Sequence, residues 1–470
     1  MSHYTMLING QMVSTSDSFD VLNPADESVL AQAPEASDAD LNAAVAAAKA
    51  AFVSWGQSPI EQRQQAMLKI SDIIKENSEE LIALLIAEQG KSQIQAEREV
   101  VQMGSAGAAA RAGMLIKPEI LEENDECRIE LDYRPLGVVA AIVPWNFPFG
   151  IAVGKLTCAI MAGCTLVLKP SPFTPLSTLR LGELIKDVLP KGVLNIITGS
   201  DSLGPKLTAH KDIAKISFTG STATGKKVMQ TAAVDLKRIT LELGGNDAAI
   251  VLDDADIDKM AYPLFLGAFG NSGQICTAVK RVYAHESIYD KLVDALAFIA
   301  SQVKVGPGSD PESQLGPIQN RAQYEKVLAV LADVKNGEGR IVAGGEEHQG
   351  KGYFLKPTIV ADVKEGCRLV DEETFGPILP VIKYTDVDDA ISRANDTLYG
   401  LGGSVWGSDI ERASKYARQL SSGSAWVNRH PNLSAFIPFA GAKNSGIGVE
   451  NHELGIKEYC QIHVVNISKK

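Results

Sequence analysis

The stretch GVVAAIV at residues 137–143 opens the series of apolar runs that decides the fold. Apolar runs and amphipathic segments then alternate along the chain, as TLVLK (165–169), LSTLRLGELIKDVL (176–189), VLNIIT (193–198), KISFTG (215–220) and ATGKKVMQTA (223–232). Short apolar runs separated by amphipathic helices are typical of a parallel sheet covered on both faces. The sequence therefore predicts a doubly wound α/β domain.

A second α/β domain is predicted because this pattern restarts after Gly244-Gly245. The expected elements are a strand in DAAIVLDD (247–254), helices through Phe269, a strand in RVYAHE (281–286) and a long helix over 288–304. Apolar residues at helical spacing predict a helical portion from Asp38 to about Gly113. Near the end, SAWVN (424–428) reads as a strand and the glycine-rich PFAGAKNSGIGVE (438–450) reads as a loop.

The uncharged stretch from Leu136 to Gly154 approaches the length of a membrane span. Pro144 and Pro148 stand in its middle, and two prolines four residues apart force an extended or turned backbone. We therefore predict a buried strand followed by a turn.

The composition bounds the class of protein. The chain has 470 residues, 45% of them hydrophobic, and a formal net charge of −12. A chain of this length is expected to form at least two domains, and its acidic balance argues against nucleic acid and anionic membrane surfaces as partners. Six cysteines without a Cys-x-x-Cys pair, and no visible signal peptide, predict a reducing compartment, the cytoplasm, and no metal site.

Two segments contain candidate catalytic residues. Cys276 lies among small polar residues in NSGQICTA (271–278), as an activated thiol would, although a lone cysteine is more often a small buried hydrophobe. Glu242 stands between apolar residues at the end of a strand-like run, where desolvation would raise its pKa towards that of a general base. The structural alternative for Glu242 is a satisfied carboxylate at a strand end.

Two further segments suit a bound oxyanion and a phosphate. Asn146 lies between two rigid turn residues in PWNFP (144–148), so its amide can donate to a developing oxyanion, or it can simply suit the turn. The segment FTGSTATG (218–225) ends a strand and opens a helix, where free N–H groups attract phosphate, although it lacks a full GxGxxG pattern.

Together these segments resemble the aldehyde dehydrogenase superfamily over nearly the whole chain. The resemblance runs, in the family's order, through PWNFP, LKPSPFTP, FTGSTATG, LELGGND, FGNSGQICTA, EETFGP and PFAGAKNSGIGVE. It implies a Rossmann-like cofactor domain (1–116 and 138–244), a catalytic domain (245–438) and a small β oligomerisation element (117–137 and 455–470). CRIELDYRP and CQIHVVNIS show strand-like alternation, consistent with edge strands that pair across a subunit boundary in a homodimer or homotetramer.

The resemblance also implies a catalytic cycle that oxidises a small-molecule aldehyde to the carboxylic acid. Cys276 would attack the aldehyde, and Asn146 with the Cys276 backbone N–H would stabilise the oxyanion. Hydride would pass to a nicotinamide dinucleotide, and Glu242 would activate the water that hydrolyses the thioester. Lys155 and Glu450 match positions that relay protons from that glutamate.

For the cofactor, the resemblance implies contacts by residues from both domains, namely Trp145, Lys169, Pro172, Gly220, Ser221, Leu243, Glu373 and Phe375. The alternative for Lys155, Glu373 and Phe375 is ordinary structure, with Lys155 on a solvated helix face, Glu373 in a surface turn and Phe375 in the core. NAD-preferring relatives commonly have a glutamate where this chain has Pro172, three residues after the ribose-binding Lys169. That glutamate binds the 2′-hydroxyl and repels a 2′-phosphate, so we expect both NAD and NADP to serve.

The aldehyde tunnel is expected to be apolar, lined by Phe147, Ile151, Ile275, Thr277, Leu433 and Phe439. An uncharged aliphatic or aromatic aldehyde is therefore the expected substrate. The alternative is that Arg429 and His430 recognise a carboxylate at the far end of a semialdehyde.

Two rival functions stay open at this point. In a CoA-acylating relative, CoA rather than water takes the acyl group from Cys276, and such relatives tend to lack the glutamate that this chain has as Glu242. A catalytically silent structural member would be free to lose Cys276, Glu242 and Asn146, all of which are present.

Overall fold

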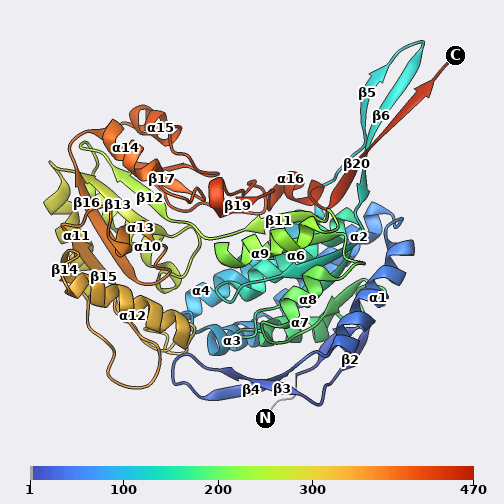
Figure 1. Ribbon diagram of the computed structural model, residues 1–470, viewed down its shortest axis with the longest axis horizontal. Coiled ribbons are helices and arrows are strands. Elements are labelled where there is room, and N and C mark those ends of the chain that lie inside the picture. The colour runs from blue at the N-terminus through green and yellow to red at the C-terminus, as the bar shows by residue number, and fades with distance from the viewer. Residues whose placement is uncertain (1–3) are drawn as a thin grey trace.

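The computed structural model describes residues 4–470, which form two large sheets, a projecting three-stranded sheet and a short two-stranded one (Figure 1). The first large sheet has the strand order β19-β11-β10-β7-β8-β9-β1-β2. Its strands are β1 (Met6–Ile8), β2 (Gln11–Val13), β7 (Val138–Ile142), β8 (Thr165–Lys169), β9 (Leu194–Ile196), β10 (Lys215–Thr219), β11 (Arg238–Glu242) and β19 (Gly446–Ile447). The five central strands, β7 to β11, are parallel, as the alternating pattern predicted.

Helices cover both faces of this sheet. They are α1 (Asp38–Trp55), α2 (Ile60–Glu76), α3 (Ser78–Gln89), α4 (Gln93–Glu97), the π-helix η1 (Arg98–Ala106), α5 (Gly107–Ala112), α6 (Pro148–Ala162), α7 (Leu176–Ile185), α8 (Leu203–Ala209) and α9 (Thr222–Ala233). Successive strand residues point to opposite faces. Val139 and Ala141 accordingly pack in one core cluster with α2 and α6, and Val138 and Ala140 in another with α1 and α9.

The segment Leu136–Gly154 contains β7, a turn and the start of α6, which confirms the prediction of a buried strand followed by a turn. Pro148 occupies the first turn of α6, where its missing N–H costs nothing. Within residues 4–470, no helix is long and apolar enough to cross a membrane.

The second large sheet has the order β14-β15-β16-β13-β12-β17-β18, and only β14 runs antiparallel to its neighbour. Its strands are β12 (Asp247–Val251), β13 (Val279–His285), β14 (Arg340–Ala343), β15 (Thr358–Ala361), β16 (Ile378–Tyr384), β17 (Gly403–Trp406) and β18 (Trp426–Val427). Its helices are α10 (Ile257–Phe269), α11 (Tyr289–Gln302), α12 (Arg321–Lys335), α13 (Arg368–Asp371), α14 (Val387–Asn395) and α15 (Ile410–Ala417). The chain crosses between the two sheets at Gly244-Gly245, directly after Glu242.

The glycine-rich segment 438–450 is not wholly a loop, which corrects the sequence prediction. It contains the 3-10 helix η3 (Lys443–Ser445) and the strand β19, which pairs antiparallel with the end of β11. A Cβ on Gly446 would lie 2.5 Å from the carbonyl oxygen of Leu241, so the close approach requires glycine. A two-residue strand with a glycine leaves no alternating apolar pattern.

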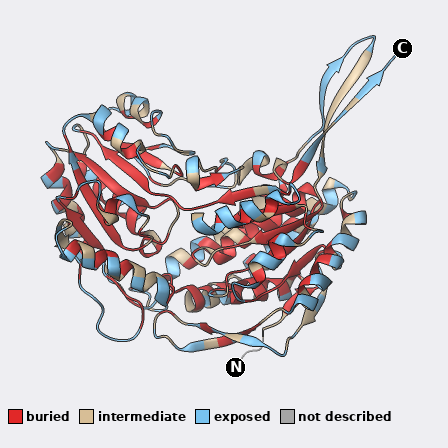
Figure 2. Cartoon of the chain, viewed as in Figure 1, coloured by how far each residue is buried: buried red, intermediate tan, exposed pale blue. Residues whose placement is uncertain are grey.

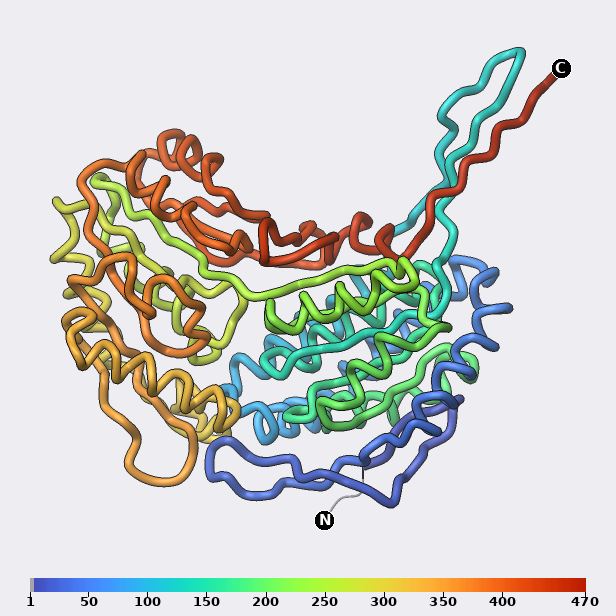
Figure 3. Tube along the Cα trace, viewed as in Figure 1, coloured from blue at the N-terminus to red at the C-terminus, as the bar shows by residue number. Residues whose placement is uncertain are grey.

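The three-stranded sheet β20-β6-β5 projects away from the rest of the chain (Figures 1 and 3) and presents mostly partly or fully exposed residues (Figure 2). Its strands are β5 (Glu119–Glu123), β6 (Cys127–Pro135) and β20 (Cys460–Ser468), and α16 (His452–Lys457) leads into β20. Contrary to the expectation of two edge strands, β6 is the middle strand, because β20 pairs with it along its whole length. The two-stranded sheet, β3 (Ser18–Leu22) with β4 (Val29–Pro34), and the strands β1 and β2 had no counterpart among the predicted elements.

Candidate active site

The turn between β7 and α6 holds Asn146 against the segment that carries Cys276. The buried Asn146 side chain donates a hydrogen bond to the carbonyl oxygen of Gln274 at 2.8 Å. Gln274 stands two residues before Cys276. The structure therefore brings together an amide donor and a thiol that lie far apart in the sequence.

A buried ion pair between Lys91 and Glu99, which the sequence analysis missed, holds this turn in place. Both side chains are fully buried. Lys91 also donates to the backbone carbonyl of Asn146 at 2.9 Å. The other carboxylate oxygen of Glu99 accepts hydrogen bonds of 3.0 Å from the N–H groups of Phe149 and Gly150, in the first turn of α6. The pair thus satisfies helix-end donors that would otherwise be unpaired.

Cys276 is partly exposed and follows a tight backbone reversal in the 3-10 helix η2 (Gly270–Gly273). Asn271 and Ser272 have φ angles of 49° and 56°, in the left-handed region. A Cβ on Gly273 would lie 2.3 Å from the carbonyl oxygen of Gly376, so only glycine fits there. The small and polar residues before Cys276 therefore build the turn that presents it.

Every backbone carbonyl from Gln274 to Ala278 lies within hydrogen-bond distance of a side chain. Asn146 binds the first, and the Lys280 ammonium donates to those of Ile275, Cys276 and Ala278 at 2.8, 2.9 and 3.3 Å. The remaining carbonyl, that of Thr277, lies 2.6 Å from Nε2 of the buried His430. Because each carbonyl is held, the peptide planes around Cys276 have fixed orientations.

The charges near Cys276 are mostly negative. Burial of the sulfur raises the pKa of the Cys276 thiol above its ordinary value, Lys280 lowers it, and the nearby carboxylates of Glu242, Asp247 and Glu373 raise it further. A reactive thiolate therefore depends on groups that counter burial and these carboxylates.

Glu242 ends β11 as a buried carboxyl without hydrogen-bond partners. Neither of its carboxylate oxygens contacts a donor in the described residues. Burial, followed by the charge of Glu450, raises the pKa of Glu242 well above its ordinary value, and Lys155 opposes this. The satisfied strand-end alternative does not hold, and the raised pKa suits a general base.

The buried Lys155 pairs with the partly buried Glu450 beside a network of hydroxyl groups. The Lys155 ammonium contacts Glu450 at 2.6 Å and Ser217 Oγ at 2.8 Å, and the Tyr459 hydroxyl donates to Ser217 at 3.1 Å. Burial alone would raise the pKa of Glu450, but the charge and hydrogen bond of Lys155, together with the charges of Lys215 and Arg111, bring that pKa below its ordinary value. Lys155 is almost fully buried, which rules out the alternative of a solvated helix face.

Lys169 ends β8 with its ammonium buried and poorly partnered. The nearest acceptor is the carbonyl of Pro170 at 3.5 Å. Burial lowers the pKa of Lys169 to about 8, and the charges of Asp201 and Glu35 oppose this shift. A buried ammonium with free donors fits hydroxyl acceptors on a ligand. Pro172 is partly exposed three residues further on.

Gly220 and Ser221 connect β10 to α9. Ser221 caps the helix by accepting from the N–H of Thr224 at 3.2 Å. A Cβ on Gly225 would lie 2.4 Å from the Leu243 side chain, so Leu243 packs directly beneath the first turn of α9. The exposed N-terminus of the helix has the geometry that favours phosphate.

Glu373 lies beside the crossing between the two sheets rather than in a surface turn. Its carboxylate accepts from the N–H of Gly245 at 3.0 Å and lies 3.8 Å from the Lys280 ammonium. A Cβ on Gly244 would meet the Glu373 carboxylate at 2.3 Å, and one on Gly245 would meet the Cys276 carbonyl at 2.7 Å. The two glycines therefore admit the close approach of these groups.

Trp145 and Phe375 pack edge to face at 5.4 Å between ring centroids, and neither is fully buried. Phe375 is thus not the simple core residue that the structural alternative would require. Trp145 belongs to the turn before α6, whereas Phe375 follows Glu373, so the two rings join the catalytic turn to the Glu373 segment.

The predicted tunnel residues differ in exposure. Thr277 and Phe439 are buried, Phe147, Ile151 and Ile275 are partly exposed, and Leu433 is exposed. The carboxylate-recognising alternative loses His430, whose Nδ1 lies 3.1 Å from Ser404 Oγ while its Nε2 lies at the Thr277 carbonyl. Both ring nitrogens are therefore occupied within the protein. Arg429 is exposed.

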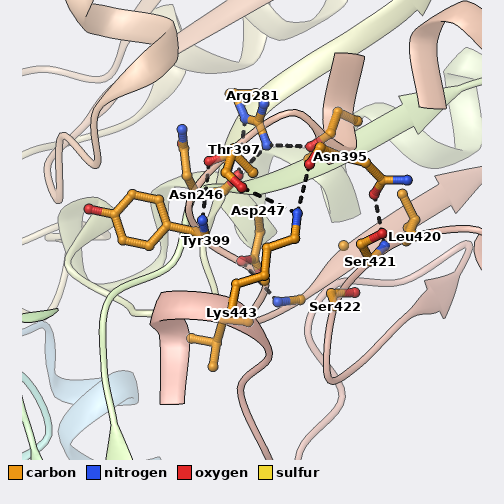
Figure 4. A pocket seen from close by; sticks show the side chains of 16 residues that line it. Asn246, Asp247, Arg281, Asn395, Thr397, Tyr399, Leu420, Ser421, Ser422 and Lys443 are labelled. Atoms are coloured by element: carbon orange, nitrogen blue, oxygen red, sulfur yellow. Dashed lines mark hydrogen bonds between the residues drawn. The ribbon is translucent and has the colours of Figure 1, made fainter. Parts of the chain in front are cut away.

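A small polar pocket borders Asn246 and Asp247 at the start of β12 (Figure 4). The Arg281 guanidinium donates to the carbonyl of Asn246 at 2.7 and 3.0 Å, and Lys443 donates to the carbonyl of Asn395 at 2.7 Å. Arg281 thus supports the crossing segment, whereas Lys443 holds the chain after α14. Among the described residues, no group of three or more His, Cys, Asp or Glu side chains could hold a metal ion.

The sequence analysis missed Lys91, Glu99 and Lys280, and it named His430 only as an alternative substrate contact, not as a partner of the Thr277 carbonyl. Lys280 did leave a signal, because a lysine interrupts the apolar start of β13. The other three are joined to the site only by the fold.

Comparison with known proteins gives a consistent result over the full chain. The Aldehyde dehydrogenase family model matches residues 12–465. A mitochondrial aldehyde dehydrogenase from Leishmania tarentolae is 39% identical over 476 residues, covering 99% of this chain and 95% of the relative. The NAD+ complex of an aldehyde dehydrogenase from Bacillus cereus has a TM-score of 0.97 at 36% identity, covering 100% of this chain and 97% of that one. An NADP dependent enzyme from E. coli has a TM-score of 0.96 at 34% identity, with coverages of 99% and 98%.

The two-sheet fold, the site that brings together the segments of Cys276, Asn146 and Glu242, and these full-length matches lead to one conclusion. The chain belongs to the aldehyde dehydrogenase family and oxidises an aldehyde to the carboxylic acid, with NAD(P) as the hydride acceptor.

Proposed function

We propose that Cys276 is the nucleophile of this oxidation and that Asn146 and the Cys276 backbone N–H stabilise the oxyanion. The observation that carries the proposal is the hydrogen bond from Asn146 to the Gln274 carbonyl, which holds the amide donor beside the Cys276 segment. Attack of the thiolate on the aldehyde carbon gives a thiohemiacetal whose oxygen bears the negative charge. Two fixed donors stabilise such a charge because they need no reorientation during the reaction.

Glu242 is proposed to act in the second half of the cycle. The nicotinamide ring, when the dinucleotide is bound, accepts the hydride from the thiohemiacetal carbon. Glu242 then takes one proton from water, whose oxygen attacks the thioester carbon; the carbon–sulfur bond breaks, and the carboxylate product leaves while the Cys276 sulfur keeps the remaining proton as the thiol. Lys155 and Glu450 carry the proton onward through their buried contact. The unpartnered carboxylate of Glu242 favours hydrolysis over transfer to CoA; a CoA requirement for NADH formation would reinstate the acylating alternative.

The residues expected around the dinucleotide suit its chemistry. Lys169 offers a buried ammonium with free donors to the ribose hydroxyls, and Gly220 with Ser221 offers a helix N-terminus to the pyrophosphate. Glu373 with Phe375 would hold the nicotinamide ribose, and Trp145 would border the cofactor cleft. Leu243 supports this region from below α9.

NAD and NADP are both proposed to support turnover. The chain has Pro172 in place of a carboxylate that would bind the 2′-hydroxyl and exclude a 2′-phosphate. A finding that NADP gives no turnover while NAD saturates normally would contradict this.

The proposed substrate is an uncharged aliphatic or aromatic aldehyde. The predicted tunnel residues Phe147, Ile151, Ile275 and Phe439 are apolar and at least partly buried, and His430 has no free nitrogen for a carboxylate. A carboxylated aldehyde would lose the solvation of its charge in such a tunnel.

A substrate panel tests these assignments together. Aliphatic, aromatic and carboxylated aldehydes are assayed separately with NAD and with NADP, and Cys276→Ala serves as the control. We expect the highest kcat/KM for uncharged aldehydes, turnover with both cofactors and none in Cys276→Ala. Preference for a semialdehyde would overturn the substrate assignment, and an active Cys276→Ala variant would overturn the mechanism. A protein that oxidises no aldehyde in the panel, and whose Cys276 no aldehyde-mimicking electrophile labels, would favour the silent alternative.

We further propose that the first large sheet and its helices form the cofactor domain and the second sheet the catalytic domain. The three-stranded sheet would join subunits of a dimer or tetramer, because its edge strand β20 exposes apolar residues such as Ile462 and Val464. Light scattering on the purified protein tests this, and a monomer would contradict it. The cytoplasmic location remains a prediction.

A further inference from the structure

Lys280 is a buried lysine on β13 for which the proposed cycle has no role. Its ammonium donates to three carbonyls of the segment that presents Cys276, and two of these, Ile275 and Cys276, lie within 2.9 Å. The side chain is almost fully buried, and its closest carboxylate, that of Glu373, is 3.8 Å away. Burying an ammonium is costly, so its placement calls for an explanation beyond packing.

The two carbonyls belong to the peptide units on either side of Cys276. The carbonyl of Ile275 shares its peptide unit with the N–H of Cys276, the proposed oxyanion donor. The carbonyl of Cys276 shares its unit with the N–H of Thr277. A cation bound to a carbonyl polarises the whole peptide unit, so the N–H at its other end becomes a stronger donor. The contacts of Lys280 therefore act on the backbone donors nearest the thiol.

The charged groups around Cys276 also indicate that Lys280 acts on this residue. The carboxylates of Glu242, Asp247 and Glu373 lie near enough to Cys276 for their charges to raise the pKa of its thiol, and negative charge there also disfavours an oxyanion. Lys280 is the cation that opposes them at this cysteine, whereas Lys155 is paired with Glu450. His430 adds a contact to the Thr277 carbonyl, so it supports the same segment.

We propose that Lys280 is a positioning residue, which orients and polarises the backbone N–H groups around Cys276 and favours the anions that form at this residue. It acts through the backbone and need not touch the substrate. The inference rests on the proposed role of Cys276 and deepens it.

The test compares Lys280→Met with the wild type, without cofactor. The rate of Cys276 alkylation by iodoacetamide is measured against pH, with a labelled-peptide readout that isolates this cysteine. In Lys280→Met we expect the midpoint of the alkylation-rate profile to rise by about one pH unit. We also expect kcat/KM for the aldehyde to fall about 10- to 100-fold, the size of a lost charged hydrogen bond. Lys280→Arg keeps the charge and should retain most of the wild-type midpoint.

The matched control is Lys237→Met. Lys237 is also buried and also donates to two backbone carbonyls, those of His210 and Ile213, but it lies at the start of β11, away from Cys276. We expect it to lower stability without moving the alkylation midpoint. Lys280→Gln is the second neutral variant and carries the same prediction if Lys280→Met does not fold.

An unchanged midpoint in the neutral Lys280 variants, or an equal shift in Lys237→Met, would overturn the proposal. Failure of the proposed role of Cys276 gives a different result, because Cys276→Ala would then retain aldehyde oxidation. The two ideas are therefore separable within one set of proteins.

Discussion

Two lysine–glutamate pairs, each with a buried lysine, support the candidate site, and they differ in their other partners. Apart from each other, Lys91 and Glu99 form side-chain hydrogen bonds with backbone groups, the Asn146 carbonyl and the first N–H groups of α6. Lys155 and Glu450 instead adjoin the hydroxyl group of Ser217. Backbone groups do not exchange protons during a reaction, whereas hydroxyl groups both donate and accept. The first pair therefore holds the site in shape, and the second suits proton movement.

The first and largest predicted effect concerns stability. Lys91→Met leaves the fully buried Glu99 without its cation, and an uncompensated buried charge costs about 3–5 kcal/mol. We expect the free energy of unfolding, measured by urea denaturation, to fall by about this amount. The double variant Lys91→Met/Glu99→Leu should be less destabilised than Lys91→Met. If the free energy of unfolding falls equally in the single and the double variant, the unpaired Glu99 charge is not the cause of the destabilisation in Lys91→Met.

The second prediction is that Lys155→Met changes catalysis more than stability. Loss of one step of general acid–base catalysis should lower kcat about 100-fold or more. The rapid burst of NADH formation in the first turnover should remain, because hydride transfer precedes hydrolysis of the thioester. Glu242 accepts a proton only when ionised, and Lys155 lowers its raised pKa. Removing Lys155 therefore moves the acid limb of the kcat profile to higher pH.

Stopped-flow NADH traces and a pH series measure both effects. Glu450→Gln is the matched variant, because it keeps the shape of the partner and removes its charge. It should lower kcat as well, but move the limb to lower pH, since Glu450 raises the pKa of Glu242. If the acid limb of the kcat–pH profile moves in neither variant, Lys155 and Glu450 do not act on the pKa of Glu242. The proposed functional difference from the Lys91–Glu99 pair would then be wrong.

The sequence predicted the parts of the molecule that leave a local pattern. The central parallel strands are apolar runs, and the segments around Cys276, Glu242 and Asn146 are short motifs whose order is informative. Both antiparallel edges of the first sheet were missed, and at one of them β19 contributes only two residues and contains Gly446. A strand held by one close backbone approach shows no periodicity.

The missed site residues have the same cause. Glu99 lies on a π-helix, and its link to the first turn of α6 joins residues about fifty positions apart. His430 had been considered as a substrate contact, because a sequence does not show that both its nitrogens are occupied. Such pairings depend on how helices and loops pack together, which a single sequence does not encode locally.

The third prediction concerns cofactor selection at Pro172, beside neither lysine pair. Pro172→Glu should introduce a carboxylate near the position expected for a 2′-phosphate and lower kcat/KM for NADP about 10-fold or more, with little loss for NAD. Kinetics with both cofactors measure the ratio. Pro172→Gln has a similar size without the charge and should change the ratio much less. An unchanged ratio in Pro172→Glu would place the 2′-position away from this residue.

The smallest predicted effect tests whether the hydroxyl network around Lys155 matters. Tyr459→Phe removes the donor at 3.1 Å from Ser217 and leaves the Lys155–Glu450 contact in place, so we expect kcat to fall only about 3- to 10-fold, the value of one hydrogen bond. Tyr289→Phe is the control, because that buried hydroxyl donates to the Val381 carbonyl in the second sheet. It should cost similar stability, measured by thermal unfolding, and leave kcat and its solvent isotope effect unchanged. If Tyr459→Phe leaves kcat as unchanged as Tyr289→Phe does, the Tyr459 hydroxyl contributes to stability and not to proton movement. The role of the Lys155–Glu450 pair in catalysis would then depend on the charge of Lys155 alone.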